Sequence, residues 1–160
     1  MPYWYICGAL PISAKKDFKM AGLKLTCFDC GQVNRVPAER LRDGPKCATC
    51  GTRLMSPKPV DIDAATLAKA ARNDDVPLVV DFWAAWCGPC RMMAPEFSKA
   101  AQSLNGVARL VKLNTETAQN ANAKYRISGI PTMIKFQGGK EKDRTAGAMR
   151  STDIERWVRG

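Results

Sequence analysis

The chain has 160 residues with a net charge of +10, seven cysteines and no histidine, and 46% of its residues are hydrophobic. The lack of histidine excludes Cys/His zinc fingers, Ser-His and Cys-His catalysis, and histidine-based pH switching. No apolar run approaches the roughly 18 residues that a membrane span needs, and the basic residues form no cluster, which favours a solvated surface over nucleic-acid binding.

Residues 1–19 do not fit the pattern that follows them. The apolar stretch from Tyr3 to Ile12 precedes its lysines, which is the wrong polarity for a secretory signal. We interpret these residues as an upstream start or an expression leader, with a disordered natural extension as the alternative. Cys7 is interpreted as an incidental thiol. Without a secretory signal, we expect a cytoplasmic protein.

Residues 20–55 contain two Cys-x-x-Cys pairs that are sixteen residues apart and each followed by glycine. The pairs are Cys27/Cys30 and Cys47/Cys50. Glycine permits the positive φ that a turn presenting two sulfurs often needs. A short strand at 32–36 and a turn at 43–45 complete the outline of a zinc ribbon. Four thiolates suit zinc or a single iron, and we predict one structural zinc; two disulfides are the alternative and would need an oxidising compartment.

A proline-stiffened linker at 56–60 separates this ribbon from a larger domain at 61–160. The domain opens with an alanine-rich helix expected at about 64–72, for which Asp61 and Asp63 are available as N-caps.

The rest of the domain alternates between strand and helix patterns. The segment 76–83 is apolar on both faces, as in the centre of a parallel sheet. A helix containing Pro95 is expected to run from near Cys87 to Gly106. The remaining expected elements are a strand at 107–113, a helix at 117–125, a hairpin of 132–136 with 141–146 around 137–140, and a last helix opened by the capping box Thr152–Glu155.

The third cysteine pair, Cys87/Cys90, stands alone at the strand-to-helix junction and indicates redox chemistry. A cysteine at the start of a helix gains thiolate character from the unpaired amides and the helix dipole. We therefore expect Cys87 to be exposed and to act as the nucleophile. Cys90, one turn further, is expected to attack the mixed disulfide that Cys87 forms.

Two motifs give this domain a family resemblance. Trp-Ala-Ala-Trp-Cys-Gly-Pro-Cys-Arg runs from Trp83 to Arg91, and Gly-Ile-Pro-Thr precedes the hairpin at 129–132. Together with the element order, these motifs resemble the thioredoxin family over residues 61–160. With the ribbon in front, the chain resembles the zinc-containing bacterial branch of that family. The expected class is α/β: a thioredoxin fold, with a central mixed sheet flanked by helices, preceded by a small zinc ribbon.

The resemblance also implies roles for individual residues. Asp81, whose pKa burial in an apolar strand should raise, is implied to be a general base for Cys90 through water, with Lys112 beside it. The alternative for Asp81 is a polar residue tolerated at a strand end, and the alternative for Lys112 is an ordinary surface lysine. The redox motif is completed by Trp86, Gly88 and Pro89, and the implied substrate-binding residues are Trp86, Ile130, the cis-proline Pro131 and Gly147.

The function implied is that of a thiol–disulfide oxidoreductase that reduces protein disulfides and is recharged by thioredoxin reductase using NADPH. Because no Gly-x-Gly-x-x-Gly follows a strand, we expect no bound NADPH or flavin. The alternative is a zinc-ribbon binding module for nucleic acid or protein that uses the second domain as a scaffold. An oxidase or isomerase would need a much more oxidising couple.

Overall fold

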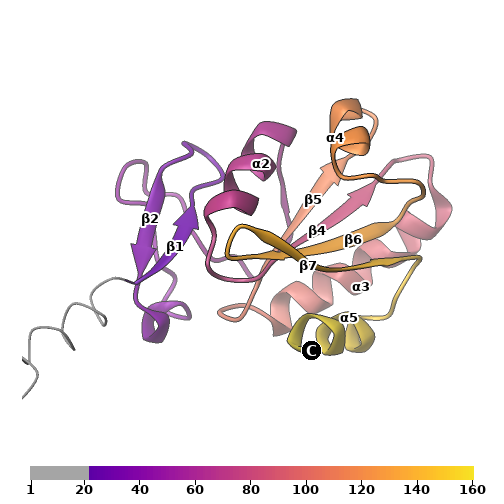
Figure 1. Cartoon of the computed structure of the whole chain (residues 1–160). Coiled ribbons are helices and arrows are strands. Elements are labelled where there is room, and N and C mark those ends of the chain that lie inside the picture. The colour runs from indigo at the N-terminus through magenta and orange to yellow at the C-terminus, as the bar shows by residue number, and fades with distance from the viewer. Residues whose placement is uncertain (1–21) are drawn as a thin grey trace, which may run out of the picture.

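The computed structural model describes residues 22–160, so the interpretation of residues 1–19 and of Cys7 lies outside the described residues. The described part contains a two-stranded sheet near its beginning and a five-stranded sheet beyond it (Figure 1). Within residues 22–160, no helix has the length and apolar character that crossing a membrane requires.

The small sheet belongs to the predicted ribbon. β1 (Leu23–Thr26) pairs antiparallel with β2 (Val33–Val36), and a short 3-10 helix, η1 (Ala38–Arg40), follows. The sequence analysis predicted β2 but not β1, which is defined as a strand by its antiparallel pairing with β2. Val36 and Leu25 lie in a small apolar core beneath this sheet.

The large sheet is mixed, as the family resemblance implied. Its strands lie in the order β3-β5-β4-β6-β7, and β4 is parallel to β5 but antiparallel to β6. The strand bounds are β3 Val60–Asp61, β4 Leu78–Trp83, β5 Arg109–Asn114, β6 Thr132–Gln137 and β7 Lys140–Ala146. β3 is a difference from the sequence analysis, which gave Val60 to the linker and Asp61 to a helix cap. These two residues become a strand because they pair with Val111 and Lys112 of β5, a contact that local sequence does not encode.

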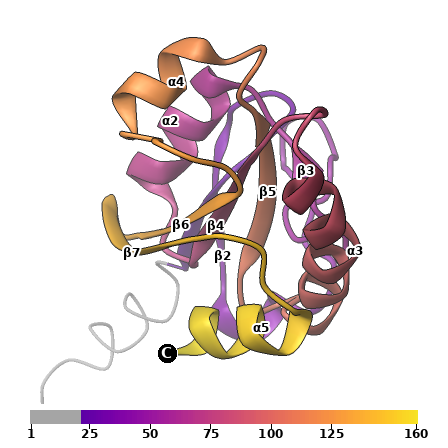
Figure 2. The ribbon, with the colours of Figure 1, turned by 90° about the vertical axis from the view of Figure 1, so that its right-hand side faces the viewer.

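Helices cover both faces of this sheet (Figure 2). Their bounds are α2 Ala64–Asn73, α3 Gly88–Ser103, α4 Gln119–Lys124 and α5 Ser151–Arg159. α3 and α5 pack on one face around Phe97 and Ile154, while α2 and α4 pack on the other around Leu67 and Phe82. β4 therefore has apolar neighbours on both sides, which explains its continuous hydrophobic sequence.

Carboxylates accept hydrogen bonds from backbone amides at the starts of α2 and α5. Asp63 caps α2 as predicted, because its carboxylate accepts a hydrogen bond from the Thr66 amide at 2.7 Å. The predicted capping box of α5 is wrong. α5 begins at Ser151, whose amide donates to Oε2 of Glu96 on α3 at 2.8 Å. A carboxylate from another helix thus replaces the local cap.

The ribbon is docked on the large domain, beside α2 (Figure 1). Along β1, the Lys24 amide donates to Oδ2 of Asp75 at 2.8 Å, and the Asp75 amide donates back to the Lys24 carbonyl at 3.0 Å. Val76, from the segment leading into β4, is buried in the apolar core of the ribbon. Backbone hydrogen bonds and apolar packing therefore join the two parts.

A buried ion pair lies at the same junction. Nη1 of Arg109 donates to Oδ2 of Asp74 at 2.6 Å, and both side chains are at most 2% exposed. The other carboxylate oxygen of Asp74 accepts from the Thr26 amide at 2.7 Å, and the Arg109 guanidinium lies 3.7 Å from the centre of the Phe28 ring. Asp74 and Arg109 come from the large domain, whereas Thr26 and Phe28 come from the ribbon. The pair is thus shared between the two parts, and we call it the interface ion pair.

Candidate functional site

The four ribbon cysteines converge on one point. Their sulfur atoms all lie within 4.8 Å of one another, with 3.5 Å between Cys27 and Cys50 and 3.6 Å between Cys30 and Cys47. Four sulfurs at Zn–S distances of about 2.3 Å would be separated by about 3.8 Å in a tetrahedron. The cluster therefore has the donor set of a tetrahedral zinc site, and two of its sulfur pairs lie close to that separation.

Two matching turns bring these sulfurs together. In the first, the Gly31 amide donates to the Cys27 carbonyl at 3.0 Å, and in the second the Gly51 amide donates to the Cys47 carbonyl at 2.9 Å. The φ angles of these glycines are +79° and +77°, which confirms the positive φ expected from the sequence. Each glycine thus lets the chain reverse directly after the second cysteine of its pair.

The ribbon also holds a polar residue that the sequence analysis did not identify. Asn34 lies on β2, and its Nδ2 donates to Sγ of Cys47 at 3.4 Å while its Oδ1 accepts from the Ala48 amide at 3.0 Å. Hydrogen bonds from the Cys50 amide and from Asn34 lower the pKa of the Cys47 thiol to about 6. Such a partner orients a ligand and favours its thiolate form, which is the form that binds metal.

The second cysteine pair lies where β4 meets α3. Cys87 is the N-cap of α3, and its Sγ accepts from the Cys90 amide at 3.2 Å. The two cysteines form a disulfide, with their Cα atoms 5.3 Å apart. The peptide bond between Ile130 and Pro131 is cis, and the Ile130 carbonyl oxygen lies 3.7 Å from Sγ of Cys87.

The expectation that Cys87 is exposed is wrong for this disulfide form. Cys87 is 4% exposed and Cys90 is 2% exposed, because Trp83, Ala84 and Ile130 pack around both. The two cysteines nevertheless differ in access. A hollow of about 400 Å³ is lined by Cys87 but not by Cys90.

This hollow gathers most of the residues predicted around the redox motif. Trp86, Gly88, Pro89 and Ile130 line it together with Cys87. Trp86 is 69% exposed, which is unusual for a large aromatic side chain and leaves an apolar surface beside the sulfur. The other two predicted substrate-binding residues do not line the hollow; instead the Gly147 amide donates to the Pro131 carbonyl at 2.9 Å.

Asp81 lies deep in the sheet. It is fully buried, and within residues 22–160 neither of its carboxylate oxygens has a hydrogen-bond partner. Burial raises the pKa of Asp81 to about 7, although the positive charge of Lys112 acts in the opposite direction. Lys112 is the register partner of Asp81 on β5, and its Nζ lies 4.5 Å from the centre of the Trp83 ring. An acid with this pKa can take or give a proton near neutral pH.

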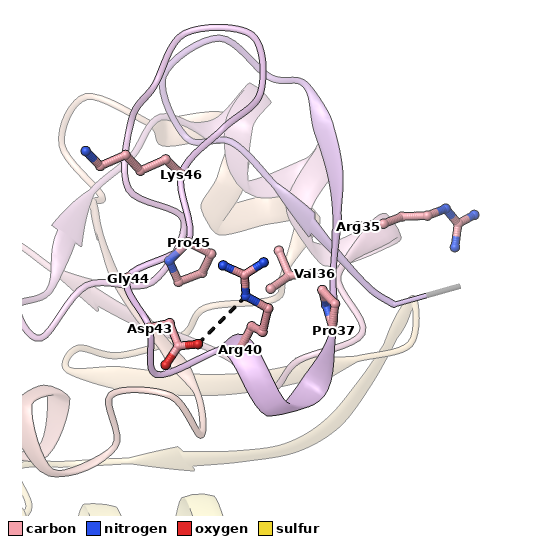
Figure 3. Close-up of a pocket in the computed structure, with 8 residues that line it drawn as sticks. All are labelled: Arg35, Val36, Pro37, Arg40, Asp43, Gly44, Pro45 and Lys46. Carbon is pink, nitrogen blue, oxygen red and sulfur yellow. Dashed lines mark ion pairs between the residues drawn. The ribbon is translucent and has the colours of Figure 1, made fainter. Parts of the chain in front are cut away.

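A further hollow lies on the ribbon, between β2 and the turn at 43–45 (Figure 3). Its cationic side chains do not converge, because Arg35 and Lys46 point in opposite directions and Arg40 lies 3.8 Å from Asp43. This arrangement does not provide the aligned basic surface that nucleic-acid binding uses.

Comparisons with known proteins agree with these two sites. A family model described as "Thioredoxin" matches residues 58–160, and one described as "Thioredoxin 2, N-terminal" matches residues 26–52. The chain is 34% identical to thioredoxin C-3 of Corynebacterium nephridii over 134 residues, which cover 84% of this chain and 92% of that protein. It is 41% identical to thioredoxin 1 of Nostoc sp. over 90 residues, covering 56% of this chain and 84% of that one.

A solved thioredoxin structure also matches this chain. The crystal structure of chloroplastic thioredoxin z matches with a TM-score of 0.58 and 31% identity, and the match covers 63% of this chain and 91% of that one. The chain therefore belongs to the thioredoxin family of thiol–disulfide oxidoreductases and carries the zinc ribbon of thioredoxin 2 in front of its redox domain.

Proposed function

We propose that this protein reduces disulfide bonds in other proteins and is returned to its dithiol form by a separate thioredoxin reductase that uses NADPH. The observation that carries the proposal is the unequal access of the two sulfurs: Cys87 borders the hollow beside Trp86, whereas Cys90 does not. An attacking sulfur has to meet its substrate, and a resolving sulfur has only to reach its neighbour.

The reaction proceeds by two thiol–disulfide exchanges. The Cys87 thiolate attacks one sulfur of the substrate disulfide, so that a mixed disulfide forms and the other substrate sulfur leaves as a thiolate. Cys90 then attacks Sγ of Cys87 and releases the second substrate sulfur. Two electrons pass from the dithiol to the substrate, and the product is the Cys87–Cys90 disulfide found in this structure.

Asp81 is proposed to accept, by way of water, the proton that Cys90 loses before it attacks. A pKa of about 7 suits this role, because such a base is partly ionised near neutral pH and still binds a proton. Lys112 is proposed to adjust the proton affinity of Asp81 through its positive charge. The side chain of Trp86, the backbone around Ile130 and Pro131, and Gly147 are proposed to bind an extended substrate segment, mainly through main-chain hydrogen bonds.

The ribbon cysteines Cys27, Cys30, Cys47 and Cys50 are proposed to hold one structural zinc ion. With four protein ligands the ion has no position for water, so its chemistry is the stabilisation of the ribbon fold. Metal-binding thiolates and a dithiol that must stay reduced both suit the reducing cytoplasm, where we place the protein.

Trapping of the mixed disulfide tests this assignment. The Cys90→Ser variant should attack insulin and stall as a covalent adduct that reducing agent releases, whereas Cys87→Ser should form no adduct. Neither variant should support insulin reduction coupled to NADPH oxidation by thioredoxin reductase. Adducts with Cys87→Ser but not with Cys90→Ser would reverse the roles of the two cysteines, and a wild-type protein inactive with reductase would contradict the proposed function.

A further inference from the structure

A hollow of about 540 Å³ lies at the β3 edge of the large sheet, and neither redox cysteine is among its described lining residues. The residues that line it come from the linker, from α3 and from β5; they are Pro57, Lys58, Pro59, Ser98, Lys99, Gln102 and Lys112. This volume falls in the range of about 300–1,000 Å³ that small-molecule sites occupy.

The lining of this hollow suits an anion. It brings together three ammonium groups, one hydroxyl and one side-chain amide, and no carboxylate is among its described lining residues. Lys99 makes an exposed ion pair with Glu96 at 3.3 Å, a type of contact that contributes little to stability. Lys58 and Lys112 have no carboxylate within ion-pair distance in the described part of the chain. A bound anion would relieve the repulsion among the three positive charges.

The side chain of one of these lysines has a defined contact, and the backbone of a second is restricted. Lys58 stands between Pro57 and Pro59, which restrict the backbone on both sides, and its amide donates to Oγ of Ser56 at 3.1 Å. Lys112 is half-buried, and its ammonium lies against the Trp83 ring. Because the Lys112 ammonium and the backbone of Lys58 are restricted before a ligand arrives, less conformational entropy is lost on binding.

We propose that this hollow binds a small phosphorylated molecule, whose diphosphate group accepts hydrogen bonds from Lys58, Lys99 and Lys112. A diphosphate matches the site because its multiple negative charge balances several ammonium groups at once. Its oxygens can also accept from the Ser98 hydroxyl and the Gln102 amide.

The site has a consequence for Asp81. Lys112 is flanked in the sheet by Asp81 on β4 and by Asp61 on β3, while Lys99 from α3 and Lys58 from the linker face the same hollow. A diphosphate beside Lys112 would weaken the effect of its positive charge on Asp81, so the pKa of Asp81 would rise. The effect of this change on catalysis rests on the proposed function, whereas binding itself does not.

Calorimetric titration of the full-length oxidised protein with pyrophosphate tests the site. Ionic strength is held constant with sodium chloride. The Lys58→Gln/Lys99→Gln variant should bind at least about tenfold more weakly, since each hydrogen bond to a charged group contributes substantially. The matched control is Lys140→Gln/Lys142→Gln, which loses the same charge from exposed positions on β7, at the opposite edge of the sheet. This control should bind like the wild type.

Three outcomes would overturn the proposal. They are wild-type binding weaker than about 1 mM, equal losses in the two double variants, and binding that leaves the NMR-detected pKa of Asp81 unchanged or lowered. Equal losses would mean general charge attraction, and an unmoved Asp81 would mean that the anion does not contact Lys112. Titration with ADP identifies the source of the phosphate: tighter binding than pyrophosphate indicates a nucleotide, and equal binding indicates a free polyphosphate. The calorimetric affinity and the NMR-detected pKa of Asp81 are both measured independently of disulfide reductase activity.

Discussion

The two cysteine sites of this protein differ in how they relate to the apolar cores around them. In the ribbon, Cys27 and Cys47 are themselves buried core residues and pack with Leu25 and Leu54. In the redox domain, Cys87 and Cys90 form a small cluster apart from the two main cores. A chemical change at the ribbon cysteines therefore disturbs the core that stabilises the ribbon. The redox cysteines, in contrast, can exchange bonds while the sheet and helices stay packed.

The two regions are nevertheless not independent, because the interface ion pair joins them. Arg109 begins β5, the strand that also carries Lys112. Burial lowers the pKa of Arg109, whereas the Asp74 carboxylate acts in the opposite direction, as a thiolate at Cys27 would. A zinc ion bound by four thiolates would leave a net charge of about −2 near this guanidinium. A zinc site at these cysteines would therefore be linked to the redox domain by electrostatics as well as by packing.

The largest effect should follow loss of a ribbon ligand. We expect Cys47→Ser to abolish zinc binding and unfold residues 22–55, because structural zinc contributes on the order of 10 kcal/mol to such small folds. The redox domain should stay folded and keep its reductase activity, since its main cores contain no ribbon cysteine. Metal analysis and NMR spectra of backbone amides measure both effects.

Cys90→Ser is the matched variant in the other region. It should keep one zinc per chain and a folded ribbon while losing turnover. If Cys47→Ser left a folded but inactive redox domain, the ribbon would be part of the catalytic machinery and the division between the two regions would fail.

The next largest effect concerns the interface ion pair. Arg109→Leu should lower the free energy of unfolding by about 3–5 kcal/mol, because it leaves the Asp74 carboxylate buried without its cation. Asp74→Leu/Arg109→Leu should recover much of this loss, since no unpaired charge remains. Urea unfolding of the full-length chain gives both values.

An exposed ion pair provides the control for this series. Arg156 and Asp153 lie 3.6 Å apart on α5 with largely exposed side chains, so Arg156→Leu should change stability by less than about 1 kcal/mol. If Arg109→Leu were equally mild, the ribbon and the redox domain would not depend on the buried pair.

The features that sequence could predict are those encoded locally. Cysteine spacing and the following glycines predict the two turns, so the four cysteines Cys27, Cys30, Cys47 and Cys50 were grouped from the sequence, and the structure brings their sulfurs together. The long apolar run of β4 and the helix that starts after Cys87 are also local patterns. Hence the position of the redox motif agrees with these local patterns, whereas the mixed sheet agrees with what the family resemblance implied.

The features that sequence could not predict depend on contacts between distant segments. Asp74 and Arg109 are 35 positions apart, and the sequence analysis gave neither residue a role, yet the fold pairs them in a buried contact. Asn34 would be expected on the surface, and only the fold places its amide on Cys47. The sequence at the start of α5 matches a capping box, but the amide at this helix start instead donates to Glu96 from α3. In each case a tertiary contact outweighs the local preference.

Asp81 is a buried carboxyl group of the redox domain, and its ionisation in the folded state costs free energy. Burial raises the pKa of Asp81 from 3.8 to about 7, so the folded state binds a proton more tightly than the unfolded state does. Stability should therefore fall as the pH rises from about 4 to about 7. Asp81→Asn removes this dependence and should be more stable than the wild type at pH 8, by at most about 4 kcal/mol if each pKa unit counts 1.4 kcal/mol. The exposed substitution Glu116→Gln is the control and should keep the wild-type slope.

The same variant should lose speed as it gains stability. Without a proton acceptor, Cys90 resolves the mixed disulfide more slowly, and the wild-type increase in rate as the pH passes about 7 should disappear in Asp81→Asn. Single-turnover release of reduced substrate between about pH 6 and 8 measures this step. Equal rates for the two proteins across that range would make Asp81 a structural residue, and the cost of burying it would then have no catalytic explanation.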